Sequence, residues 1–244
     1  MRPNYGIDAP GVVLCLFVIG VATILIAFVP GVPAFFVAAI PWIGGSWLAT
    51  AIVMVAGSKF FKLRFRDRLV DALKLAGTER ALDLGCGRGL MLVGLAKKLS
   101  NGTAVGVDLW NSSDQSGNNA ASTARNARIE NVEHRIQIET ADMRKLPFEP
   151  HSFDCVVSTW AIHNIPDGEG RASALREAAR VLKPGGQLVV ADILKVGEYE
   201  RVLAEIPMAN LKLSRPNFLF GIPTRTIWAV KPAEANVDKN LTLS

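Results

Sequence analysis

The sequence predicts an α/β protein with a Rossmann-like, mostly parallel sheet of seven strands and helices on both faces, preceded by a transmembrane helical hairpin. Two observations lead to this fold class. Residues 9–58 contain no Asp, Glu, Lys, Arg or His, and beyond about residue 69 short apolar runs alternate with segments of helical periodicity. Such an alternation is typical of a parallel sheet whose crossover helices cover both faces.

The uncharged segment predicts two membrane spans. A helix crosses the ~30 Å hydrocarbon core with about 20 residues, so a run of about 50 fits two helices. Pro30, Gly31 and Pro33 interrupt it. We therefore expect residues 1–58 to form a membrane hairpin with spans near 9–29 and 34–56. A cleaved signal peptide has a shorter apolar region, and a buried hairpin of a soluble protein would show a polar stripe; both alternatives fit less well.

The charges that flank the apolar segment predict its orientation. Cations gather just after the second span: Lys59, Lys62, Arg64, Arg66 and Arg68. The turn at 30–33 carries no charge, so the positive-inside rule places both termini and the following domain in the cytoplasm. Residues 59–76 are expected to form a basic juxtamembrane helix in the headgroup layer, although a stop-transfer signal would look the same. A lipid bilayer as partner, rather than nucleic acid, then explains the net charge of +5; the oligomeric state stays open.

The remainder predicts one soluble domain over residues 77–232, followed by a loose tail at 233–244. The expected strands are 80–84, 103–109, 135–140, 153–162, 187–194, 211–218 and 224–230. The expected helices are 65–73, 90–99, 120–129, 172–182 and 198–205. The three cysteines have no paired spacing, which predicts neither a disulfide framework nor a metal site.

A glycine-rich turn follows the first predicted strand and predicts a ligand site. It runs from Asp83 to Gly89, and its glycines allow a sharp turn and a close backbone approach to a ligand. The next helix adds free N–H groups at its amino end. A dinucleotide-binding turn would have the spacing G-x-G-x-x-G, but Leu90 stands at the position of the third glycine. Asp83 suits a cationic ligand better than a pyrophosphate.

Acidic residues close the next two predicted strands. Asp108 could accept both hydroxyls of a ribose, and Asp142 could accept from an exocyclic amine. Either carboxylate could instead cap a helix. Because the carboxyl ends of parallel strands lie at one edge of a sheet, we expect these side chains to gather beside the glycine turn.

With these motifs, residues 69–232 resemble the class I S-adenosylmethionine-dependent methyltransferases, in the group that includes quinone, sterol and arsenite methyltransferases. The resemblance implies S-adenosyl-L-methionine as cofactor. It implies that Asp108 holds the ribose, that Leu109 packs on the adenine, and that Asp142 and Met143 read the adenine edge. Thr159 would offer its backbone to the methionine amino group. The residues implied around the methionine part and the sulfonium are Asp83, Gly85, Cys86, Gly87 and Gly89.

Two segments lie outside this resemblance. Most members of the group lack the hairpin, and the polar connection at 110–118 is longer than usual. Asp114, Gln115 and Asn118 are candidates to cover the cofactor or bind the methyl acceptor, whereas a solvated loop is the alternative. The apolar patch at 218–223 could face the membrane, form the acceptor entrance or be a buried turn.

His163, just after the fourth predicted strand, is the candidate general base, because an imidazole titrates near neutral pH. It could instead be a cap or a wall of the pocket. The expected reaction is methyl transfer to a lipophilic or membrane-associated acceptor: a phospholipid amine, a quinone or phenol, or a thiol. Two alternatives stay open. One is methylation of a small soluble acceptor with the hairpin used only for localisation, and the other is a non-catalytic membrane protein that binds S-adenosylmethionine.

Overall fold

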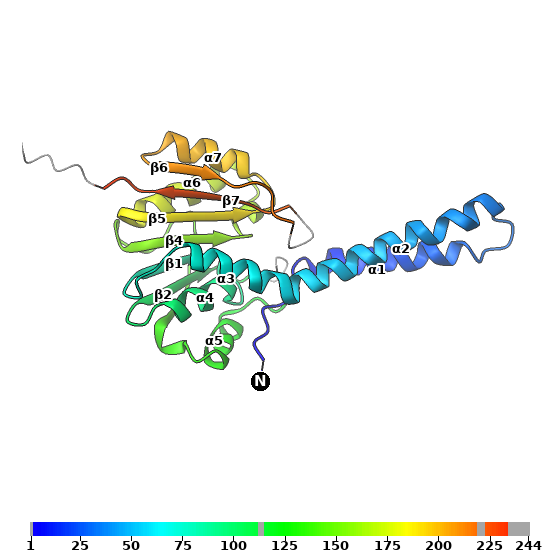
Figure 1. Ribbon diagram of the computed structural model, residues 1–244, viewed down its shortest axis with the longest axis horizontal. Coiled ribbons are helices and arrows are strands. Elements are labelled where there is room, and N and C mark those ends of the chain that lie inside the picture. Colours follow the sequence, from blue (N-terminus) through cyan, green and yellow to red (C-terminus); the bar gives the residue numbers. More distant parts are fainter. Residues whose placement is uncertain (1, 112–114, 219–222, 234–244) are drawn as a thin grey trace, which may run out of the picture.

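The computed structural model describes residues 2–111, 115–218 and 223–233, which form an α/β domain and a projecting helical hairpin (Figure 1). Asp114, residues 219–222 of the apolar patch, and the tail from 234 lie outside the described residues. The strands are β1 (Arg80–Leu84), β2 (Thr103–Asp108), β3 (Ile136–Thr140), β4 (Phe153–Thr159), β5 (Leu182–Asp192), β6 (Ala209–Leu213) and β7 (Arg225–Val230).

The sheet has the seven strands that the sequence predicts, and their order is β3-β2-β1-β4-β5-β7-β6. Strands β1 to β5 pair in parallel, whereas β7 runs antiparallel to β5 and β6 antiparallel to β7. The sheet is therefore mixed, with five parallel strands and an antiparallel pairing at one edge. The parallel strands all point their carboxyl ends toward the base of the hairpin (Figure 1).

Helices cover both faces of the sheet because the strands are apolar on both. Two successive residues of β1 show this division: Ala81 belongs to one buried cluster and Leu82 to the other. The first cluster includes side chains of α3 (Lys62–Ala72), α4 (Leu90–Lys98) and α5 (Ala120–Ile129). The second includes side chains of α6 (Gly168–Val181) and α7 (Val196–Glu205).

Several strand ends differ from the sequence prediction. Strand β4 ends at Thr159, three residues earlier than expected, because Trp160 adopts a left-handed conformation (φ 52°) and a short 3₁₀ helix, Ile162–Asn164, follows. Strand β5 begins at Leu182, five residues before the predicted start at 187, since Leu182 already pairs with Phe153. Another 3₁₀ turn, Glu133–Arg135, leads into β3. These shifts move the β4–β5 connection but not the order of the strands.

The hairpin consists of α1 (Pro10–Ile26) and α2 (Ala34–Ala56), which lie side by side and project from the domain (Figure 1). Their contact is close at Gly20 and Gly44. A Cβ added to Gly44 would lie 2.5 Å from Ile24 Cγ1 and 2.8 Å from the Gly20 carbonyl oxygen. The outer surface is apolar and open: Trp42 is 83% exposed. At 17 residues, α1 is shorter than the predicted span.

Helix α2 continues without a break into the domain. It passes through a π-helical turn, Gly57–Phe61, into α3, so that Ala34–Ala72 is one helix of 39 residues. This helix is long and apolar enough to cross a membrane, whereas α1 falls short of that length. The basic segment predicted as a separate helix over 59–76 is the end of this long helix and stops at Ala72.

Candidate functional site

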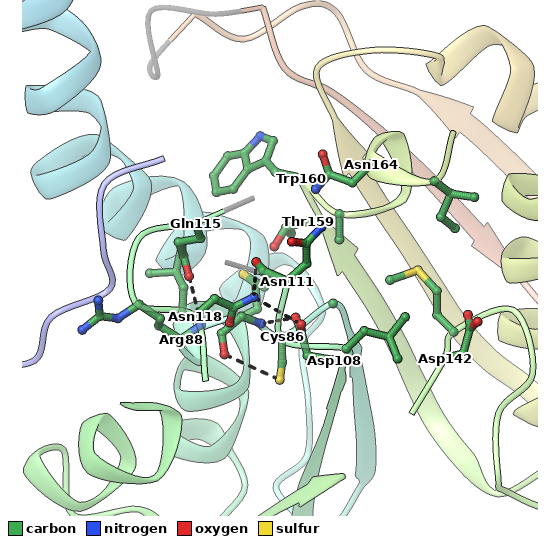
Figure 2. A pocket seen from close by; sticks show the side chains of 18 of the residues that line it. Cys86, Arg88, Asp108, Asn111, Gln115, Asn118, Asp142, Thr159, Trp160 and Asn164 are labelled. Atoms are coloured by element: carbon green, nitrogen blue, oxygen red, sulfur yellow. Dashed lines mark hydrogen bonds between the residues drawn. The ribbon is translucent and has the colours of Figure 1, made fainter. Parts of the chain in front are cut away.

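A cavity of about 240 Å³ opens at the carboxyl ends of β1, β2 and β4 (Figure 2). It brings together most of the residues that the sequence singled out as cofactor-binding. The predicted residues that line it are Gly85, Cys86, Gly87, Asp108, Leu109, Asp142, Met143 and Thr159. The candidates Gln115 and Asn118 of the polar connection line it as well.

The glycine turn forms the floor of the cavity. Gly85 has a φ of 72°, and a Cβ there would collide with the Ala161 side chain. Gly87 has a φ of 50°, and a Cβ there would lie 2.9 Å from Gln115 Oε1. Burial and the nearby carboxylates raise the pKa of the Cys86 thiol well above its usual value, so this side chain is a neutral part of the core. The turn therefore offers backbone rather than side chains to a ligand.

Asp108 closes β2 and is held by hydrogen bonds from its surroundings. Its Oδ2 accepts from the Gly87 amide at 2.8 Å, and its Oδ1 accepts from the Trp110 amide at 2.6 Å. Asn118 Nδ2 also donates to Oδ1, at 3.3 Å. The other end of this amide, Asn118 Oδ1, is buried and accepts no hydrogen bond within the described chain. Because a buried acceptor is costly to leave unpaired, Asn118 is suited to accept from a ligand.

The opposite wall combines an apolar surface with a paired carboxylate. Leu109 is 59% exposed beside the cavity, which leaves an apolar face that a ring could cover. Asp142 is held by Arg144, with Nη2 2.7 Å from Oδ2 and the Arg144 amide 2.9 Å from Oδ1. The hydrogen bonds from this guanidinium lower the pKa of Asp142, so the carboxylate is ionised. An amine bound here would share Asp142 with Arg144.

Two predicted cofactor residues lie outside the cavity lining. Asp83 is fully buried below the turn, and its oxygens make no well-formed hydrogen bond to any described residue. Burial is the main reason that the pKa of Asp83 rises to about 8. Gly89 is the N-cap residue of α4 with a φ of 82°, and a Cβ there would lie 2.9 Å from Thr123 Cγ2. The position of Gly89 is thus explained by helix packing, and ligand contact by either residue stays a prediction.

His163 lies beside the cavity rather than in its lining, although its neighbours Ala161 and Asn164 both line it. Its Nδ1 is 2.5 Å from Oδ1 of Asp192, and its amide donates to Oδ2 at 3.1 Å. Asp192 is 1% exposed and also accepts from the Tyr199 hydroxyl at 3.1 Å. An Nδ1–H donated to this carboxylate leaves Nε2 of His163 as the proton acceptor.

Sequence reasoning missed two parts of the cavity wall. Trp160 and the residues after it line the cavity, and the Trp160 ring lies 5.0 Å from that of Phe65 in α3 while its Nε1 donates to Thr224 Oγ1. Asp8, from the segment before α1, also lines the cavity. Trp160 could have been suspected from its place directly after β4. Nothing in the sequence around Asp8 connects it with the glycine turn.

Comparisons with known proteins identify the domain. Residues 82–190 match the protein family described as "Methyltransferase domain". The chain is 35% identical over 133 residues to a 27-O-demethylrifamycin SV methyltransferase of Amycolatopsis mediterranei, covering 54% of this chain and 45% of that protein. It is 31% identical over 129 residues to a demethylmenaquinone methyltransferase of Lactobacillus johnsonii, covering 52% and 49%. The chain thus spans about half the length of these curated relatives.

Residues 82–190 are thus similar to the methyltransferase domains of these proteins. The fold agrees with a solved S-adenosylmethionine-dependent methyltransferase from Aquifex aeolicus, with a TM-score of 0.55 and 16% identity over 70% of this chain and 92% of that one. The match to methyltransferases supports S-adenosylmethionine as the cofactor. The cavity fits it on two observations of this structure: the glycine floor leaves room for close contact, and the unpaired Asn118 Oδ1 beside Asp108 matches the hydroxyls of a ribose.

Proposed function

We propose that the chain is a membrane-anchored S-adenosylmethionine-dependent methyltransferase with a lipophilic or membrane-associated acceptor: a phospholipid amine, a quinone or phenol, or a thiol. The observation that carries the proposal is the position of the cavity at the base of the apolar hairpin. Asp8 lines the cavity, and α1 begins two residues later at Pro10. An acceptor dissolved in a bilayer would meet the cavity where the hairpin enters the domain.

The outer surface of the hairpin supports the membrane part of this proposal. Large apolar side chains, such as Phe35 (78% exposed) and Trp42, are exposed on this surface. Contiguous apolar surface of this kind marks contact with a membrane or a partner. Exposed cations follow at Lys59, Arg64 and Arg68, where anionic headgroups would lie and where the positive-inside rule favours the cytoplasmic side.

The catalytic contribution of the chain would be positioning and removal of a proton. The bound cofactor supplies an electrophilic methyl group. Orienting an acceptor against it can contribute ~7–11 kcal/mol. Where the acceptor carries a proton, His163 Nε2 would take it, with Asp192 holding the imidazole in orientation. A quinone-type acceptor has support from the name of the Lactobacillus johnsonii relative.

The proposal is tested by reconstituting the full chain in lipid with methyl-labelled cofactor and a total membrane extract, and identifying labelled products by mass. A labelled lipid-soluble product is expected. A labelled water-soluble product alone would favour a small soluble acceptor. Cofactor binding without any labelled product would favour a non-catalytic role.

The role of His163 has a separate test. His163→Ala is expected to lower turnover by about 10²–10⁴-fold, the usual contribution of a general base, with little change in cofactor affinity. His134→Ala, in the 3₁₀ turn before β3 and outside the cavity lining, is the matched control. Full turnover by His163→Ala would exclude the imidazole as base.

A further inference from the structure

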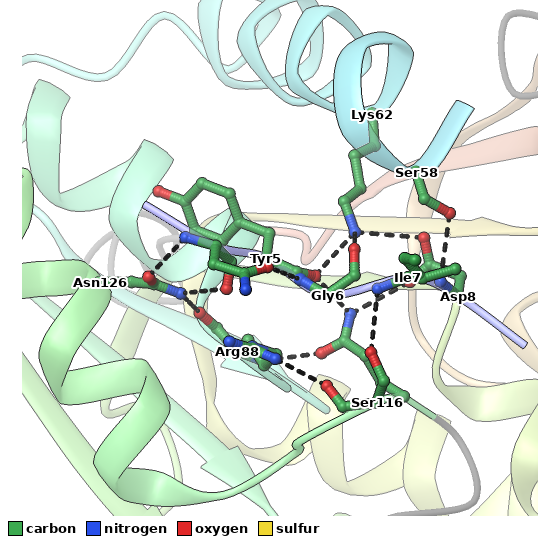
Figure 3. A network of polar contacts seen from close by, with 11 residues as sticks. Tyr5, Gly6, Ile7, Asp8, Ser58, Lys62, Arg88, Ser116 and Asn126 are labelled. Atoms are coloured by element: carbon green, nitrogen blue, oxygen red, sulfur yellow. Dashed lines mark hydrogen bonds and ion pairs between the residues drawn. The ribbon is translucent and has the colours of Figure 1, made fainter. Parts of the chain in front are cut away.

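Residues 4–8, which we call the strap, lie across the glycine turn instead of extending away from the domain (Figure 3). Tyr5 and Gly6 are buried, and Asp8 reaches the cavity lining. The strap pairs with the polar connection through an isolated β-bridge between Asp8 and Gln115. A segment of this length has no core of its own, so side chains from the domain must hold it.

Lys62 of α3 is the main side chain that holds the strap. Its Nζ donates to the Tyr5 carbonyl at 2.7 Å and to the Gly6 carbonyl at 3.0 Å, and it pairs with Asp8 Oδ2 at 3.2 Å. An ammonium has three donors, and all three are used here. Lys62 is only 2% exposed. Burial lowers the pKa of Lys62 and the Asp8 carboxylate opposes this, so the charged amine depends on its partners in the strap.

Gln115 connects the strap to the floor of the cavity. Its Oε1 accepts from the Arg88 amide in the glycine turn at 3.1 Å. Its Nε2 donates to the Tyr5 carbonyl at 3.0 Å and to Asp8 Oδ1 at 3.1 Å. One side chain thus bridges the glycine turn and the strap. A displacement of either segment would break hydrogen bonds to the other.

The far end of the strap is tied to the same turn through α5. The Asn4 amide donates to Asn126 Oδ1 at 2.9 Å, and Asn126 Nδ2 donates back to the Asn4 carbonyl at 2.9 Å. The same Nδ2 also donates to the Arg88 carbonyl at 2.9 Å. The glycine turn is therefore linked to the strap at two separate points.

The start of α1 and the end of α2 both lie beside the strap. The strap leads directly into α1, and the Asp8 amide donates to Ser58 Oγ at 3.1 Å, at the start of the π-helical turn that follows α2. Lys62 stands one turn further along the same long helix. The hairpin base and the cavity wall are consequently one hydrogen-bonded unit.

We propose that the strap is a wall of the S-adenosylmethionine site, that Lys62 and Gln115 are the positioning residues that hold it, and that cofactor binding is coupled to the seating of the hairpin base. The proposal rests on the cofactor of the domain and not on the nature of the acceptor. Coupling of this kind is reciprocal: if the seated strap strengthens cofactor binding, bound cofactor must stabilise the strap by the same factor.

The test uses the full chain in detergent micelles and S-adenosylhomocysteine, the demethylated cofactor, as probe in calorimetry. Lys62→Met keeps an unbranched side chain, one atom shorter, and removes all three bonds to the strap. We expect its dissociation constant to rise at least tenfold. Lys59→Met, one turn earlier on the exposed side of the helix, is the matched control and should bind like the wild type.

A second variant and a second measurement separate positioning from loss of the fold. Gln115→Glu keeps the acceptor for the Arg88 amide but turns a carboxylate oxygen toward Asp8, which should free the strap and weaken binding. Hydrogen exchange of the peptide covering residues 2–9 should slow when the wild type binds the probe. In Lys62→Met this exchange should be fast and should respond weakly to the probe.

The outcomes distinguish two failures. A wild type that does not bind S-adenosylhomocysteine would overturn the cofactor assignment itself. A wild type that binds it, with both variants binding equally well and strap exchange unchanged by the probe, would overturn the strap proposal alone. If Lys62→Met loses its near-ultraviolet circular dichroism, Gln115→Glu decides the matter.

Discussion

The hairpin and the sheet domain place apolar side chains in opposite surroundings. In the domain, Leu82 and Val156 are completely buried, whereas in the hairpin Phe35 and Trp42 are almost fully exposed. Burial of apolar side chains stabilises the domain against water. The two hairpin helices instead make contact where small residues let their backbones approach, as at Gly44. This difference agrees with the proposal that the domain lies in water and the hairpin in a bilayer.

Matched leucine truncations test this comparison with the largest expected effect. Leu92→Ala, in the domain core at 0% exposure, should lower the free energy of unfolding by about 2–5 kcal/mol through lost burial and a cavity. Leu25→Ala, 60% exposed on the hairpin, should lower it by less than about 0.5 kcal/mol. Chemical denaturation in micelles measures both. Equal losses would mean that the outer face of the hairpin is packed against protein.

A change in the domain alone should affect the cofactor without affecting the hairpin. Asp108→Ala removes the acceptor of the Gly87 and Trp110 amides. The affinity for S-adenosylhomocysteine should fall by about 1–3 kcal/mol, the cost of leaving buried polar groups unpaired. Calorimetry measures the affinity, and an unchanged near-ultraviolet circular dichroism spectrum shows that the fold is intact. Unchanged affinity would contradict the ribose assignment.

Neighbouring glycines sharpen the comparison within the hairpin. Gly44→Leu would press against Ile24 and the Gly20 carbonyl, and overpacking of this kind costs about 1–3 kcal/mol. Gly45→Leu is the matched control, because a Cβ there meets nothing within 4 Å. Titration with a denaturing detergent, followed by circular dichroism, should show earlier unfolding for Gly44→Leu only. The same loss in both variants would place Gly45 in an interface as well.

The buried carboxylate of the domain should make its stability depend on pH. The folded pKa of Asp83 is about 8, against an unfolded value of about 3.9, so the folded state keeps a proton that the unfolded state releases. The contribution of Asp83 to stability is therefore lost as the pH rises from about 4 to about 8. Asp83→Asn stays neutral and should flatten the pH dependence of unfolding over this interval. Glu205→Gln, exposed at the end of α7, should leave it unchanged.

Sequence patterns could predict the domain because its signals are local. Apolar runs locate β1 and β2, and the position of Asp108 after such a run places it at the cavity edge. The strap could not be predicted, since its contacts join residues far apart in the chain: Asn4 meets Asn126 and Asp8 meets Gln115. No periodicity or motif in the sequence predicts such long-range contacts. His163 was placed at the correct edge, but its distance from the cavity lining depends on how the chain turns after Trp160.

The unbroken helix from Ala34 to Ala72 has a mechanical consequence. A flexible linker would let the catalytic domain tumble above the bilayer, sampling many heights and tilts. The continuous helix instead packs on the domain through Phe65 and Leu69, which restricts this tumbling. In a membrane the mouth of the cavity would then keep one distance from the bilayer and one orientation toward it. Under the proposed function, a lipid-dissolved acceptor would reach the cavity by lateral diffusion in the bilayer.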